Sequence, residues 1–350
     1  MTRRYSRRDF IGLALSAAAF PWLACKRSAE RVVNFFNWSL YISPKTLPRF
    51  TERTGIKVNY EEIADDEEMF AKLRAGVGGY DVVVASDYMI PRMRELGLID
   101  PYPAGALKNL RHIDPKFRAT PYDPDNSYTV PYMWGTTGIG YNRGKVKSPP
   151  QSWWALWDES YRGKISMLDN ARDNIATALL LKGYPETTTD PKAFADISEM
   201  LSRQRPLVKQ YSSGTYIDNL ITGEISLAMS WSGDVLQAAR ENPQLDYVIP
   251  KEGSYLWVDN LLLVRGGPNR EEALQLIDFL LEPEVNAEIT SFVRYASPNA
   301  SARKLLDPGL LSDPRVFPPA SVMKRLRIHA LLPPETTQLW NQTWSDIKLG

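Results

Sequence analysis

Short apolar runs alternate with helix-length amphipathic stretches along the chain from residue 31 onward, and turn-forming residues lie between them. This alternation predicts α/β layers around mainly parallel sheets, because parallel strands are connected through helical crossovers. The first predicted strands cover residues 32–36, 56–60 and 80–85. Ser43-Pro44 predicts the start of the first helix, with an N-cap followed by proline, and Gly55 predicts its end.

The middle of the chain predicts a passage from one lobe to another. Gly135, Gly138 and Gly140 follow one another closely, and we interpret them as glycine-rich turns at this crossing. The elements predicted after it are helices at residues 191–203, 214–221, 234–242 and 271–281, and strands at residues 225–230, 247–250 and 257–264. The tail from Ser301 is rich in proline and predicts irregular structure, until a last helix follows Glu335.

The first 24 residues are typical of a secretion signal rather than of a folded element. Arg7 and Arg8 precede Phe10 and Ile11, and an apolar stretch runs over residues 11–23. This order predicts a twin-arginine signal peptide over residues 1–24, which would export the protein already folded. A basic arm that binds anions is the alternative interpretation.

Cys25 is the only cysteine of the chain and stands where the apolar stretch ends. It resembles the lipidated cysteine of bacterial lipoproteins, although Trp22 replaces the aliphatic residue usual in that pattern. We expect residues 25–30 to link a membrane anchor to the folded body, and an ordinary cleavage site with an incidental thiol is the alternative. One cysteine forms no internal disulfide, so the signal alone predicts a periplasmic or extracytoplasmic location.

The composition predicts a globular body large enough for two lobes, with 43% hydrophobic and 24% charged residues. Removing residues 1–24 takes away four of the 42 basic and one of the 41 acidic side chains, which leaves 38 and 40. This near-neutral balance, without a basic stripe of interleaved aromatic residues, argues against a nucleic-acid partner.

Motifs for catalysis do not occur in the sequence, which has no H-E-x-x-H, G-x-S-x-G or G-x-x-x-x-G-K-[ST] pattern. His112 and His329 lie far apart in the chain, and we expect both to be surface or packing residues. The acidic run at residues 61–62 and 65–68 is interpreted as a solvated helix start, with a capping box, rather than as a carboxylate pair or cation site. The sequence predicts no enzyme, no metal site and no cofactor.

Aromatic residues are numerous, with 10 Trp and 17 Tyr, and several lie in turns beside polar residues. Four segments combine aromatic rings with hydroxyl or carboxylate groups near the ends of predicted strands, at residues 37–41, 86–88, 230–233 and 257–259. Because ligands bind at the carboxyl ends of strands in open α/β sheets, we expect these segments to converge. Flat rings and spaced carboxylates suit an aliphatic chain that carries ammonium groups, as a polyamine does.

Several stretches resemble the bacterial spermidine/putrescine-binding proteins. They are Phe36-Asn37-Trp38 and residues 54–58, 80–83, 131–140, 250–253 and 297–299, and the similarity runs in order from about Val32 to the last helix. The resemblance implies an α/β fold of the two-lobed periplasmic binding protein type (type II-like), with crossover hinge strands and a ligand cleft between the lobes. We place the first lobe at residues 31–135 and 259–303, and the second at residues 136–258 and 304–350.

The resemblance also implies a function and its partners. The protein would be a monomeric extracytoplasmic solute-binding protein that captures a polyamine and delivers it to the permease subunits of an ABC transporter. The implied ligand-binding residues include an aromatic box, polar neighbours and the carboxylate of Asp259, and they are Trp38, Ser39, Tyr41, Ser86, Tyr88, Asn170, Asp173, Trp231, Trp257, Asp259 and Tyr295.

Three departures from the family pattern bear on the ligand. Leu40 stands where spermidine-specific members have an acid, Asn170 replaces a carboxylate, and the glutamine that the family draws from near its C-terminus has no evident counterpart. At least two anionic contacts are thus weakened, so we expect a ligand with fewer charges, or a different charge spacing, than spermidine.

Two other hypotheses remain open from the sequence. The same fold could bind another small solute, such as an amino acid, an opine-like compound or a phosphonate, and Arg172 is the candidate for an anionic group. The chain could instead be an exported hydrolase or a sensor that signals through a partner.

Overall fold

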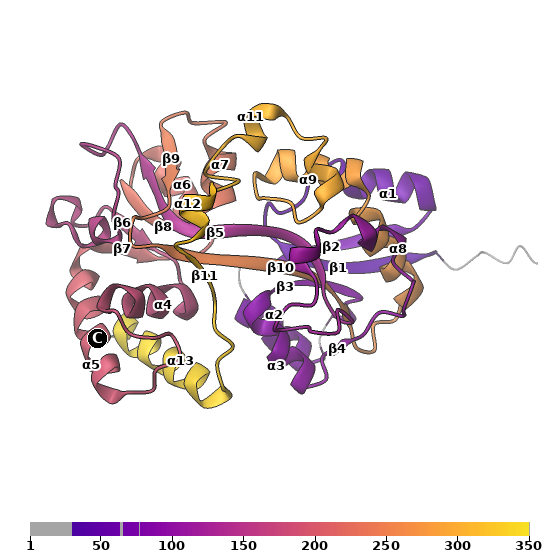
Figure 1. Cartoon of the computed structure of the whole chain (residues 1–350), viewed down its shortest axis with the longest axis horizontal. Helices are drawn as coiled ribbons and strands as arrows, with labels where there is room; N and C mark the ends of the chain where they lie inside the picture. The colour runs from indigo at the N-terminus through magenta and orange to yellow at the C-terminus, as the bar shows by residue number, and fades with distance from the viewer. Residues whose placement is uncertain (1–29, 64–65, 77, 350) are drawn as a thin grey trace, which may run out of the picture.

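The computed structural model describes residues 30–63, 66–76 and 78–349, which form two α/β lobes side by side (Figure 1). This confirms the predicted two-lobed α/β fold. The predicted twin-arginine segment and the predicted lipid-acceptor Cys25 lie outside the described residues. Among the described residues, no helix has the length and apolar character needed to cross a membrane.

The first lobe is built around the parallel strands β1 (Val32–Trp38), β2 (Lys57–Ile63) and β3 (Val82–Ser86), with β1 in the middle. Apolar side chains of β1 and β3, such as Phe35, Phe36 and Val83, are fully buried. Phe35 and Phe36 point to opposite faces of the sheet, so helices cover both faces. Those helices are α1 (Thr46–Thr54), α2 (Asp66–Arg74), α3 (Ile90–Glu95), α8 (Arg270–Leu280) and α9 (Pro283–Val293), and a short strand β4 (Ile99–Asp100) lies at the edge.

The second lobe repeats this plan with the parallel strands β6 (Ile165–Met167), β7 (Val208–Tyr211) and β8 (Leu227–Trp231). Strand β9 (Leu245–Val248) pairs with β5 on the other side. The helices of this lobe are α4 (Ala171–Lys182), α5 (Pro191–Gln204), α6 (Tyr216–Thr222), α7 (Ser232–Ala238) and α13 (Pro334–Leu349). Trp340 and Trp344 of α13 pack into the same apolar cluster as Leu179 and Ile197.

Two long antiparallel strands, β5 (Val130–Asn142) and β10 (Ser254–Val264), run through both lobes (Figure 1). β5 pairs with β10 as far as Thr136 and with β8 from Thr137 onward, so it changes partner between the lobes. The sheet is therefore mixed, and the prediction of mainly parallel sheets was wrong for these central strands. The exact lobe boundaries proposed from the sequence stay a prediction.

Gly135, Gly138 and Gly140 lie inside β5, so the interpretation as turns was wrong. These residues are glycines because neighbouring groups approach the backbone closely. A Cβ atom on Gly135 would lie 2.6 Å from the Trp257 ring, and one on Gly138 would lie 2.5 Å from the Tyr247 hydroxyl. Glycine inside a strand commonly marks such an approach.

The first helix begins two residues later than predicted, at Thr46 rather than at Pro44. Ser43 instead starts a turn, in which its carbonyl accepts a hydrogen bond from the Thr46 N–H at 3.0 Å. The predicted end is confirmed, because Gly55 adopts φ 69° and its N–H caps the Thr51 carbonyl.

The tail is more regular than predicted. It contains the short helices α10 (Ala300–Arg303), α11 (Pro308–Leu311) and α12 (Ala320–Met323), and the strand β11 (Leu326–Ile328). β11 pairs in parallel with the start of β10, opposite residues 254–256. This pairing returns the chain to the middle of the molecule before α13 begins.

Candidate functional site

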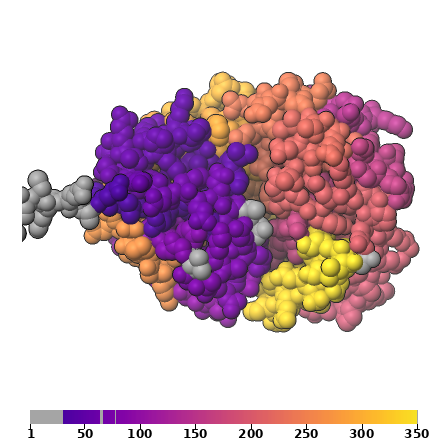
Figure 2. Space-filling model, turned by 180° about the vertical axis from the view of Figure 1, so that it is seen from behind, coloured from indigo at the N-terminus to yellow at the C-terminus, as the bar shows by residue number. Residues whose placement is uncertain are grey.

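A cavity of about 430 Å³ lies between the lobes, a size typical of small-molecule sites. Figure 2 shows the hollow between the purple N-terminal part of the first lobe and the salmon part of the second lobe, with the yellow C-terminal helix beside its lower end. The structure brings all the residues predicted to bind ligand to the walls of this cavity: Trp38, Ser39, Tyr41, Ser86, Tyr88, Asn170, Asp173, Trp231, Trp257, Asp259 and Tyr295. Their contact with a ligand stays a prediction.

The ends of strands place most of these side chains. Trp38 is the last residue of β1, Ser86 of β3 and Trp231 of β8. Asp259 lies on β10 at the point where its pairing with β5 shifts register, between Asp259 and Asn260. Strands of both lobes therefore end at the cavity, as expected for an α/β ligand site.

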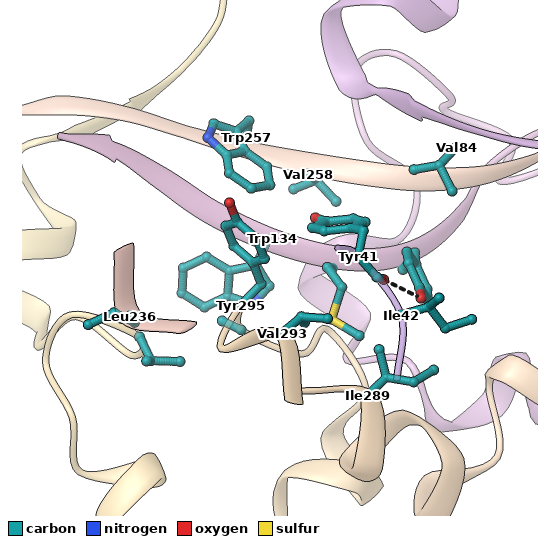
Figure 3. Close-up of a cluster of buried hydrophobic side chains, with 14 of the residues drawn as sticks. Tyr41, Ile42, Val84, Trp134, Leu236, Trp257, Val258, Ile289, Val293 and Tyr295 are labelled. Carbon is teal, nitrogen blue, oxygen red and sulfur yellow. Dashed lines mark hydrogen bonds between the residues drawn. The ribbon is translucent and has the colours of Figure 1, made fainter. Parts of the chain in front are cut away.

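Aromatic rings form one wall of the cavity. The Tyr295 ring lies 5.0 Å from the Tyr41 ring and 5.2 Å from the Trp257 ring, both near edge-to-face, and Figure 3 shows the three residues beside the crossing strands. Gly233 makes room for this packing, since a Cβ atom there would lie 2.4 Å from Tyr295. Trp38 and Trp231 are half-buried, so parts of their rings stay open to a ligand.

Asp259 is the most deeply buried carboxylate of the cavity, with 3% of its surface exposed. Its Oδ2 accepts a hydrogen bond from the Tyr41 hydroxyl at 2.8 Å, and its Oδ1 accepts one from the Ser86 hydroxyl at 2.9 Å. No described Lys or Arg forms an ion pair with it. Burial, with the negative charges of Asp66 and Asp87 adding to it, raises the pKa of Asp259 to about 8.

Asp66 is a cavity residue that sequence analysis missed. The interpretation of residues 65–68 as a solvated helix start is wrong for Asp66, which is 6% exposed and lines the cavity. It accepts hydrogen bonds from the Tyr88 hydroxyl at 2.7 Å and from the Ser86 N–H at 3.2 Å. α2 therefore begins with an acid that faces inward.

Asp173 and Asn170 stand at the start of α4. The Asn170 side chain caps the helix by accepting a hydrogen bond from the Asp173 N–H at 3.1 Å. The Asp173 carboxylate accepts hydrogen bonds from the Thr137 hydroxyl at 2.7 Å and from the Trp231 indole N–H at 3.3 Å. Burial raises the pKa of Asp173.

Asp234, in the first turn of α7, is a second carboxylate that sequence analysis missed. It accepts hydrogen bonds from the Tyr295 hydroxyl at 2.5 Å and from the Tyr216 hydroxyl at 2.8 Å, and burial raises its pKa. The sequence signal was present, because the segment recognised at residues 230–233 ends one residue before it.

His329 reaches the cavity from the C-terminal segment, one residue after β11. Its ring stacks on Tyr255 with centroids 4.3 Å apart, which agrees with the predicted packing role, but its place on the cavity wall was not predicted. Nearby, Arg172 is buried and pairs with Glu186 at 3.2 Å. The positive charge of Arg172 is thus already matched by a buried carboxylate.

The electrostatic character of the cavity is acidic. Four largely buried carboxylates face it, those of Asp66, Asp173, Asp234 and Asp259. Leu40 stands on its wall 63% exposed and adds no charge. Among the described residues, no three His, Cys, Asp or Glu side chains are grouped as metal ligands. Aromatic walls and carboxylates without metal geometry suit an organic cation.

The sequence is similar to those of known solute-binding proteins. Residues 45–318 match the family described as bacterial extracellular solute-binding protein. The chain is 37% identical to the spermidine/putrescine-binding periplasmic protein of Salmonella typhimurium, over 89% of this chain and 90% of that protein. It is 35% identical to the putrescine-binding periplasmic protein SpuD of Pseudomonas aeruginosa, over 97% of both.

A solved structure supports the fold. The spermidine/putrescine ABC transporter substrate-binding protein PotD of Streptococcus pneumoniae superposes with a TM-score of 0.78 at 30% identity, covering 91% of this chain and 99% of that one.

Proposed function

The chain belongs to the bacterial extracellular solute-binding proteins, and from that premise we propose that it captures a polyamine of the putrescine and spermidine class for import by an ABC transporter. The observation that carries the proposal is Asp259, a buried carboxylate without a basic partner among the described residues, beside aromatic rings. A buried negative charge is costly unless a cation offsets it, and an ammonium guest supplies that cation.

The geometry supports reversible capture without covalent chemistry. Asp259 offsets one ammonium group, and Asp173 on the other lobe offsets a second. The rings of Trp257 and Trp231 enclose the methylene chain between them, since alkyl groups next to an ammonium pack well on indole faces. β5 and β10 connect the lobes, so bending of these strands would open and close the cavity.

Calorimetric titration with putrescine, spermidine and spermine tests the proposal. We expect at least one of the three to bind. The substitution Asp259→Asn keeps the shape but removes the charge, and we expect it to weaken binding by about 2 to 5 kcal/mol. Asp125→Asn, at an exposed carboxylate, is the matched control and leaves affinity unchanged. Absence of heat with all three polyamines refutes the proposal, and an unchanged affinity of Asp259→Asn removes Asp259 from its role.

Export, anchoring and the partner are further parts of the proposal. We propose that residues 1–24 direct twin-arginine export, that Cys25 carries a lipid anchor, and that the monomeric body then delivers its ligand to permease subunits without catalysing a reaction. Mass spectrometry of the mature N-terminus distinguishes a lipidated Cys25 from a simple cleavage product. Gel filtration reports the oligomeric state, and turnover assays on amides and glycosides report any hydrolysis.

A further inference from the structure

A gap in the strand pairing lies on β10 between the two lobes. β5 covers one edge of β10, opposite residues 256–261. On the other edge β11 pairs with residues 254–256 and β3 with residues 259–263, so among the described residues no strand lies beside Trp257 and Val258 there. Both residues are nevertheless buried. Buried backbone N–H and carbonyl groups need hydrogen-bond partners, so side chains have to bond to the backbone groups that face this gap.

Two side chains bond to the backbone of Val258. Asp87 Oδ2 accepts a hydrogen bond from the Val258 N–H at 3.1 Å, and Asn260 Nδ2 donates one to the Val258 carbonyl at 2.9 Å. Asp87 directly follows β3 and is 1% exposed. Its carboxylate thus takes the place that a longer β3 would have beside Val258.

The Asp87 carboxylate is well suited to hold an N–H group. Burial raises the pKa of Asp87 to about 6, while the Val258 N–H and the charge of Arg172 limit this rise, so the side chain is mainly ionised at pH 7. A hydrogen bond to an ionised acceptor is stronger than one between neutral groups. Asp87 forms no ion pair with a described Lys, Arg or His, so none of them draws its carboxylate away from Val258.

Val258 stands between two residues of the cavity wall. Trp257 and Asp259 are two positions apart on β10, so their side chains leave the strand on the same face, and both line the cavity. Figure 3 shows Trp257 and Val258 next to each other on the crossing strand. Asp87 itself is not part of the cavity wall. A shift of the Val258 backbone would therefore turn both neighbours away from a guest that Asp87 does not contact.

We propose that Asp87 is a positioning residue for ligand binding, which holds the Val258 N–H and thereby keeps Trp257 and Asp259 directed into the cavity. The inference rests on the proposed function, because Trp257 and Asp259 are the groups that would meet the guest. A longer acid or an apolar side chain in place of Asp87 would leave Val258, and with it both neighbours, in another position.

Three substitutions at Asp87 separate position from charge. Asp87→Asn keeps an acceptor oxygen at the same reach and loses the charge, Asp87→Glu keeps the charge and moves it by one methylene, and Asp87→Leu removes the acceptor. In calorimetric titrations with putrescine and spermidine at pH 8, we expect Asp87→Asn to bind the better ligand within about threefold of the wild type. Asp87→Leu should bind it about 10- to 100-fold more weakly, and Asp87→Glu should lie between the two.

The two conservative variants decide the question even if Asp87→Leu does not fold. A weak Asp87→Asn variant beside an Asp87→Glu variant that binds like the wild type would mean that Asp87 acts through its charge alone. That result would overturn the inference.

Asp81 supplies a matched control at the other end of β3. It is also 1% exposed, and its carboxylate accepts backbone N–H groups, from Asn34 at 2.8 Å and from Asn269 at 2.7 Å, but it is not part of the cavity wall. Asp81→Leu should therefore lower the melting temperature, while the folded protein binds the polyamine like the wild type. A loss of affinity equal to that of Asp87→Leu would point to a general effect of a weakened β3 and would overturn the inference.

A double-mutant cycle with Asp259→Asn tests whether Asp87 acts through its neighbours. If Asp87 positions Asp259, part of its effect is already absent once the charge of Asp259 is removed. The fold-loss of affinity caused by Asp87→Leu should thus be at least about threefold smaller in the Asp259→Asn background than in the wild type. Two losses that simply multiply would contradict the proposed positioning.

The same titrations separate this inference from the proposed function. If a polyamine binds the wild type and Asp87→Leu binds it as tightly, the inference fails while the proposed function stands. If no polyamine binds the wild type, the proposed function itself fails, and the inference fails with it.

Discussion

Ligand capture should release protons, and Asp259 makes this prediction quantitative. The pKa of Asp259 is raised to about 8 in the ligand-free cavity, so at pH 7 about nine molecules in ten carry the protonated acid. An ammonium group binds the ionised form. Binding at pH 7 therefore releases close to one proton from this residue, and ionising Asp259 costs about 1.4 kcal/mol, or tenfold in affinity.

The assay is calorimetry in buffers of different ionisation enthalpy. We expect the apparent binding enthalpy at pH 7 to change with the buffer in the direction of proton release. Affinity should rise about tenfold for each pH unit between 6 and 7, and level off above pH 8, because Asp259 is then already ionised. Asp173 and Asp234 also have raised pKa values and contribute with the same sign.

The substitution Asp259→Asn isolates this contribution, since asparagine does not titrate. Its proton release at pH 7 should be smaller than that of the wild type by close to one proton. Equal release by the two proteins, or an affinity of the wild type that is independent of pH between 6 and 8, would refute the account of Asp259 as a buried acid that a guest ionises.

Two further predictions concern the ligand-free protein. The pKa of Asp259 is higher in the folded than in the unfolded protein, so its contribution to stability is fully present below about pH 4 and is lost as the pH rises towards 8. Asparagine does not titrate, so the melting temperature of Asp259→Asn should fall less than that of the wild type across this pH range. Gly233→Ala should lower the free energy of unfolding by about 1 to 3 kcal/mol in chemical denaturation, because the new Cβ atom would lie 2.4 Å from the Tyr295 ring, whereas Gly214→Ala, with open space around it, should be close to neutral. Equal effects of the two glycine substitutions would contradict this packing argument.

Much of the fold could be predicted because its signals are local. Helix α8 and strands β1, β3 and β10 follow apolar periods that appear within single windows of the sequence, and Gly55 marks a helix end by its own backbone preference. The mixed sheet could not be predicted this way. The glycines of β5 carry the same local signal whether they form turns or admit the rings of Trp257 and Tyr247, and only the packed structure distinguishes the two.

In the candidate site, too, residues with a local sequence signal were predicted, and residues placed by tertiary structure were missed. Strand ends with aromatic and hydroxyl residues are visible in the sequence, and the structure gathers Trp38, Ser86 and Trp231 as expected. Asp66 was missed because an acid in the first turn of a helix is ordinary, and nothing local tells which helix points its start into a cavity. His329 was missed because its position depends on β11 pairing with β10, residues about seventy positions away in the chain.

Asp259 sits on β10, one of the two strands about which the lobes would turn. A residue near the axis of rotation moves little when the lobes turn, whereas Asp173 and Trp231, on the second lobe, would move farther relative to the first lobe. A dissociating ligand would accordingly lose its contacts with Asp173 and Trp231 first and its contact with Asp259 last. The dissociation rate would then depend on residues of the second lobe, and substitutions there would change this rate without changing the contact at Asp259.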